Sequence, residues 1–103
     1  MKDCLLTIVF PAGLKENVLD ELLAHPEWGR GFTCLDVEGH GSAVPLKDSA
    51  EEVRGRSDQA MVQIAMSKSD AAELLNALRR AVRNPHVAYR IAPLIDFGTF
   101  GSE

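Results

Sequence analysis

Two short apolar runs constrain the fold of this chain most, and each is followed by a helical pattern. CLLTIVF occupies residues 4–10 and AMVQIAM occupies residues 60–66. Runs of this length are typical of strands, and nearly continuous apolar sequence indicates a strand that is covered on both faces. We therefore predict that these two segments are the central strands of one sheet.

Two amphipathic helices are predicted, one after each apolar run. Residues 14–25 and 71–82 both place apolar side chains at helical spacing, which gives each helix one buried stripe. Pro26 is expected to end the first helix in a turn, and Ser69 with Asp70 offers an N-cap for the second. The predicted stripes are Leu14, Val18, Leu19, Leu22 and Leu23 in the first helix, and Ala71, Leu74, Leu75, Leu78 and Val82 in the second.

Two further strands are predicted outside the apolar runs. Residues 32–38 alternate, with Thr33, Leu35 and Val37 on one face and Phe32, Cys34, Asp36 and Glu38 on the other. Residues 86–97 form the last strand, followed by a tail. Pro93 cannot donate a hydrogen bond to a ladder, so this strand is expected at an edge or with a bend.

The order of these elements specifies a fold class. Right-handed connections turn βαββαβ into one antiparallel sheet with both helices on the same face. With 103 residues the chain is long enough for one domain with a modest core. We predict an α+β, ferredoxin-like βαββαβ sandwich over residues 1–103, with sheet order 4-1-3-2.

Two helices can cover only one face of such a sheet. The other face would present either Cys4, Leu6, Ile8 and Phe10 or the alternate residues of the same strand, together with matching residues of the third strand. A large exposed apolar surface is usually an interaction site. We therefore expect a homo-oligomer in which the bare sheet faces pack together.

A long polar segment joins the second and third strands. Loops of this length in compact domains are mostly functional or disordered, and we expect residues 43–57 to be mobile without a ligand. Gly39 and Gly41 flank His40 at the loop base, where glycine permits close approach of the backbone to a ligand. Arg54 and Arg56 on the loop are candidates for pairing with an anionic effector. The alternative is a flexible strand exit with ordinary surface arginines.

Metal binding is a second possibility at the loop base, with His40 and Glu38 as the candidate ligands. Zinc takes three or four ligands in tetrahedral geometry. Cys34 and His40 would lie roughly 20 Å apart on one extended strand, so they cannot share an ion within one subunit. Cys4 and Cys34 are more typical of core residues, and with a strand between them we expect no disulfide.

Charge and hydropathy exclude several classes of protein. The net charge is −4, with acids and bases interspersed, whereas nucleic-acid-binding domains carry a basic stripe. No apolar run approaches the roughly 18 residues of a transmembrane helix, and Asp3 argues against a signal peptide. We expect a cytoplasmic protein without direct membrane insertion.

The sequence resembles the PII-like signalling family from Met1 to about Phe100. The likeness rests on GFTCLDVEGHG (31–41), on the long loop at about 42–59, which is similar to the family's T-loop, and on MVQIAMSKSDAAELLNALRRAV (61–82). The resemblance implies a non-enzymatic homotrimer that binds small effectors, often adenine nucleotides, in clefts between subunits. It also implies that the loop docks on a partner protein.

The sequence differs from the nitrogen-regulatory members of this family in three segments. The segment 42–59 contains no tyrosine, RNPH (83–86) replaces a longer phosphate-binding loop, and IDFGTF (95–100) replaces the family's C-terminal basic residues. The chain looks more like shortened PII-like proteins associated with heavy-metal efflux systems, which implies a membrane transporter as partner.

Two other functions on the same architecture stay open. One is a CutA-like protein that binds a divalent metal, and the other is an ACT-like regulatory module that binds an amino acid. An acylphosphatase-like enzyme is disfavoured, because PAGLK (11–15) lacks the arginine that such a site needs. An RNA-recognition module is disfavoured by the scarcity of aromatic residues on the central strands.

Overall fold

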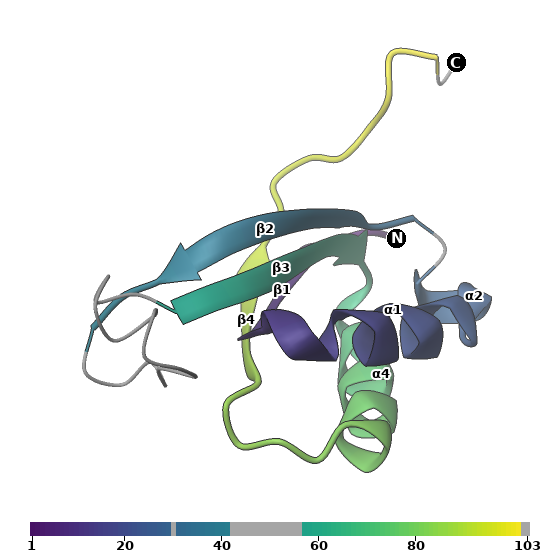
Figure 1. Ribbon diagram of the computed structural model, residues 1–103. Helices are drawn as coiled ribbons and strands as arrows, with labels where there is room; N and C mark the ends of the chain where they lie inside the picture. Colours follow the sequence, from purple (N-terminus) through teal and green to yellow (C-terminus); the bar gives the residue numbers. More distant parts are fainter. Residues whose placement is uncertain (30, 42–56, 102–103) are drawn as a thin grey trace.

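A computed structural model describes residues 1–29, 31–41 and 57–101 of the chain. The elements follow the predicted βαββαβ order (Figure 1). The strands are β1 (Cys4–Pro11), β2 (Thr33–Gly39), β3 (Ser57–Met66) and β4 (Ala88–Pro93). The helices are η1 (Ala12–Leu14, a 3-10 turn), α1 (Lys15–Leu23), α2 (Pro26–Gly29) and α4 (Lys68–Ala81).

The four strands form one antiparallel sheet in the order β2-β3-β1-β4. This is the predicted order 4-1-3-2 read from the opposite edge, so the predicted fold class is confirmed. The two apolar runs are central, and the strand that contains Pro93 lies at an edge. Proline has no N–H to donate to a ladder, and an edge strand needs ladder hydrogen bonds on one side only, so an edge position suits proline.

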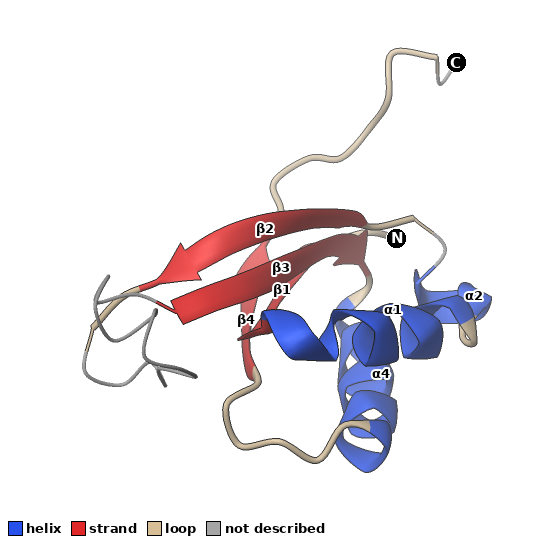
Figure 2. Ribbon diagram, viewed as in Figure 1, coloured by secondary structure: helices blue, strands red, loops and turns tan. Residues whose placement is uncertain are grey.

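The core lies between one face of the sheet and the helices α1 and α4, which both lie on that face (Figure 2). Every second residue of β1 and β3 points into it and is buried, while α1 and α4 contribute most of the apolar residues predicted for their stripes. These buried residues are Cys4, Leu6, Ile8, Phe10, Val18, Leu22, Ala60, Val62, Ile64, Met66, Ala71, Leu74, Leu75 and Leu78. The face away from the helices is therefore built from the alternate residues of the strands.

The helix ends differ from the predictions in three places. Leu23, predicted to be buried, is 67% exposed at the last position of α1. Pro26 begins the short helix α2 instead of a turn, which suits proline because the first helical N–H needs no partner. The N-cap of α4 is Ser67, whose hydroxyl accepts a hydrogen bond from the Asp70 N–H at 3.2 Å, so Ser69 and Asp70 lie inside the helix.

The strand ends also differ from the predictions. β3 begins at Ser57, so the last residues of the predicted loop are strand residues paired with β2. β4 covers Ala88–Pro93 rather than residues 86–97, and the C-terminal tail consequently begins at Leu94. The remainder of the predicted loop, residues 42–56, lies outside the described residues. None of the helices in the described ranges combines the length and apolar character needed to cross a bilayer.

Adjacent leucines in α1 test this packing directly. Leu22 is 0% exposed, whereas its neighbour Leu23 is 67% exposed. Leu22→Ala should lower the free energy of unfolding by about 2–5 kcal/mol, because it leaves a cavity in the core. Leu23→Ala should change it by less than about 0.5 kcal/mol. Urea denaturation measures both changes. Equal losses would mean that Leu22 and Leu23 are equally buried, which would contradict the orientation of α1 described here.

Candidate functional site

The base of the long connection lies where β2 ends. Gly39 is the last residue of β2 and pairs with Ser57 of β3. His40 follows, and Gly41 has a φ of 105°, a conformation that side-chain-bearing residues rarely adopt. The structure thus brings the three predicted residues together at one corner of the sheet, with a glycine that turns the chain out of the strand.

His40 contacts a carboxylate in this corner. Its Nε2 lies 3.4 Å from Glu38 Oε1, and its side chain is 61% exposed. The imidazole is therefore accessible from solvent. Within the described ranges, no group of three or more histidine, cysteine, aspartate or glutamate side chains is placed to hold a metal ion. His40 and Glu38 together supply two ligands, fewer than zinc requires.

A surface hollow of about 460 Å³ lies beside this corner. Its lining residues are Ala12, Asp36, Val37, Glu38, Asp58 and Gln59. Lys15 Nζ donates to Asp36 Oδ1 at 3.1 Å, and this hydrogen bond and charge raise the pKa of Lys15. Carboxylates dominate the lining, which favours a cationic group over a phosphate at this point. The predicted cationic residues Arg54 and Arg56 lie outside the described residues.

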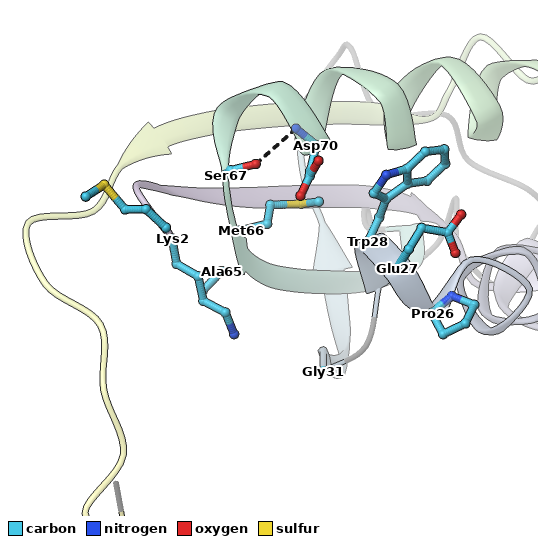
Figure 3. Close-up of a pocket in the computed structure, with 10 residues that line it drawn as sticks. Lys2, Pro26, Glu27, Trp28, Gly31, Ala65, Met66, Ser67 and Asp70 are labelled. Atoms are coloured by element: carbon cyan, nitrogen blue, oxygen red, sulfur yellow. Dashed lines mark hydrogen bonds between the residues drawn. The ribbon is translucent and has the colours of Figure 1, made fainter. Parts of the chain in front are cut away.

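A larger hollow, of about 580 Å³, lies at the other end of β3 (Figure 3). Lys2, Trp28 and Asp70 are among the residues that line it. The hydroxyl of Ser67 already accepts from the Asp70 N–H there, and the Asp70 carboxylate would repel an anion at this helix terminus. Its charged groups are of both signs, so the lining selects no single class of ligand.

His25 contacts residues of α1 and α2 on either side of it. His25 Nε2 lies 3.0 Å from Glu21 Oε1, and its ring stacks on Trp28 with centroids 5.0 Å apart.

The short connection before β4 is a tight turn in which Asn84 Oδ1 accepts from the His86 N–H at 2.8 Å. The Val87 N–H donates to the Asn84 carbonyl at 3.2 Å. This turn is too short to wrap around a phosphate in the manner of a longer loop.

Both cysteines are free thiols. Cys4 pairs with Met66 and Cys34 with Val62, so β3 separates them, as predicted. Burial raises the pKa of Cys4, and the neighbouring Asp3 charge adds to the effect. A buried, protonated thiol is a poor metal ligand, which agrees with the expectation that Cys4 is a core residue.

The sheet face away from the helices, here called the bare face, is organised in rows across the strands. Ala88, Val9, Met61 and Leu35 pair in succession across β4, β1, β3 and β2 and form an apolar row. The adjacent row is polar and consists of Arg90, Thr7, Gln63 and Thr33. The bare face thus carries the alternate residues of β1 rather than Cys4, Leu6, Ile8 and Phe10. Sequence reasoning missed the rows because they depend on strand register.

Solved structures with a similar fold include three from different organisms. A DUF3240 family protein from Shewanella baltica has a TM-score of 0.75 at 21% identity, covering 97% of this chain and 98% of that one. CPII from Thiomonas intermedia, a nitrogen regulatory PII-like protein bound to ADP, AMP and bicarbonate, has a TM-score of 0.64 at 18% identity and covers 89% of both chains. A putative PII-like signalling protein from Thermus thermophilus has a TM-score of 0.61 at 20% identity, covering 89% of this chain and 85% of that one.

These likenesses show a shared PII-like fold. Among curated proteins, none matches the chain. A family model described as a protein of unknown function (DUF3240) matches residues 1–101, which is nearly the whole sequence. The chain therefore belongs to the DUF3240 family.

Proposed function

We propose that this protein is a non-enzymatic regulatory protein of the PII-like kind, which works as a cytoplasmic homotrimer. The bare face is the observation that carries the proposal. It has a complete apolar row across four strands, and within the described residues Arg90 is the one charged side chain at its strand positions. A face of this composition suits contact with other copies of the chain better than contact with water.

The effector is proposed to bind in the clefts between subunits, beside the loop base. Gly39 and Gly41 allow close backbone approach, and exposed His40 offers a hydrogen-bonding ring. Because carboxylates line the hollow beside this corner, the phosphates of a nucleotide would bind outside that hollow, where Arg54 and Arg56 would supply positive charge. An adenine nucleotide is supported by the fold shared with CPII, which is bound to ADP and AMP. A divalent metal is supported by the His40–Glu38 pair. A metal would then need further ligands from a neighbouring subunit.

The segment 42–59 is proposed to dock the protein on a partner, with a heavy-metal efflux transporter as the candidate. Ser57, Asp58 and Gln59 of this segment are strand residues paired with β2, so the proposed contact with the partner is assigned to residues 42–56. The proposal rests on the resemblance of this segment to a T-loop. Binding of an effector at the loop base would then change partner docking through residues that continue directly into the loop.

Charge placed on the bare face should break the assembly. Met61 lies in the centre of the apolar row, paired with both Val9 and Leu35. Met61→Lys should convert a trimer to a monomer, because burying an unpaired ammonium costs several kcal/mol. Light scattering at micromolar concentration measures the mass. Leu23→Lys, on the helix side, is the matched control and should leave the trimer intact; a wild-type monomer would refute the proposal.

A thermal-shift screen tests the effector site. ATP, ADP, AMP, cyclic nucleotides and Zn²⁺, Cu²⁺, Ni²⁺ or Co²⁺ should include a stabilising ligand, since saturation at a hundredfold the dissociation constant adds about 2.7 kcal/mol. His40→Ala should reduce that shift while leaving the ligand-free melting temperature unchanged, because the side chain is exposed. His86→Ala is the control with the same chemical change. Stabilisation by amino acids alone would instead support an ACT-like module.

A further inference from the structure

The C-terminal tail leaves the domain on the side of the bare face. After Pro93 the chain rises away from the sheet, opposite the helices (Figure 1). The Leu94 N–H donates to the Asp3 carbonyl at 3.0 Å, which fixes the start of the tail. Leu94 and Phe97 then border a hollow whose floor includes Leu5 and Gln63 of the bare face. The tail therefore begins at the surface through which the copies are proposed to meet.

The tail carries large apolar side chains, and its own chain leaves two of them wholly exposed. Phe97 lies under Lys2, with Nζ 4.2 Å from the ring centroid. Ile95 and Phe100 are 104% and 108% exposed, so none of the described residues shields them. These two residues lie within six positions of each other, on a segment that points away from the domain. Full exposure of two side chains of this size indicates a surface that binds another molecule.

The bare face offers one cation to such a segment. Arg90 is exposed on β4 and lies beside Thr7 in the polar row. In the described part of the chain, Arg90 makes no ion pair and no side-chain hydrogen bond. If copies pack against this face, the guanidinium becomes buried, and a buried charge needs a partner of opposite sign.

The tail offers one anion. Asp96 is the single acidic residue between Leu94 and Gly101, and it lies directly between Ile95 and Phe97. Its carboxylate accepts the Phe97 N–H at 2.9 Å and has capacity for further donors. Arg90 is six residues away along the same extended chain, roughly 20 Å. Pairing within one chain is therefore geometrically disfavoured.

We propose that the tail of one copy lies across the bare face of a second copy, with Asp96 paired to Arg90 of the partner subunit. Ile95 and Phe100 then cover apolar positions of the partner's sheet. An apolar segment with one central carboxylate thus matches an apolar face with one guanidinium, in composition and in charge. This inference rests on the proposed assembly through the bare face and specifies a contact that holds it together.

A charge-exchange cycle tests the pairing. Arg90→Asp and Asp96→Arg should each raise the dissociation constant of the assembly by roughly tenfold or more, because each juxtaposes like charges in a buried contact. The double variant should recover most of the affinity, because the pair is restored with its signs reversed. Sedimentation equilibrium over a dilution series measures all four proteins. Arg83→Asp, with the same charge change on the helix side, should have no effect.

A second pair of variants tests the apolar contact without altering charge. Ile95→Ser with Phe100→Ser should also weaken the assembly, whereas Leu23→Ser on the helix side should not. The tail contact would be overturned if the single variants had no effect, or if the double charge variant showed no recovery. In either case, a trimeric wild-type protein would still support the proposed assembly. A monomeric wild-type protein would overturn both, so the two failures are distinguishable.

Discussion

A four-stranded sheet has two faces, and the helices in the described part of this chain cover only one of them. The central strands β1 and β3 bury one set of alternate residues against α1 and α4. The other set faces away from the helices, and Thr7 and Gln59 are polar members of it that are already buried within one chain. This uncovered second face is the reason that we propose contact with a partner surface. It also explains why strand register matters, because register decides which side chains share a row.

The element order and the identity of the central strands were predictable because each depends on local periodicity. Nearly continuous apolar sequence distinguishes β1 and β3 from the alternating strand β2, and Pro93 marks β4 as an edge strand. The errors lie at element ends. Leu23 continues the helical spacing but is the last residue of α1 and is 67% exposed. Ser67 and Ser69 both fit a capping pattern, and only the backbone decides between them.

The candidate site was predictable where it is local in sequence. Gly39, His40 and Gly41 are adjacent residues, and Glu38 lies two positions away from His40, so the chain itself holds them together at the end of β2. The row that joins Arg90 to Thr33 was not predictable, because it crosses four strands. A shift of one residue in any pairing would move the whole set to the other face. The exposure of Ile95 and Phe100 likewise depends on β4 ending at Pro93 rather than at residue 97.

The three methionines of the chain offer the most direct measurement of the central claim, that copies of the protein cover the bare face. Met1 is 101% exposed and Met66 is 4% exposed, so they bracket the possible oxidation rates within one molecule. Met61 lies on the bare face between these extremes. Peroxide oxidation followed by peptide mass spectrometry reports each rate separately. At micromolar concentration the account predicts that Met61 is oxidised as slowly as Met66. A Met61 rate between those of Met66 and Met1, unchanged by dilution, would contradict it.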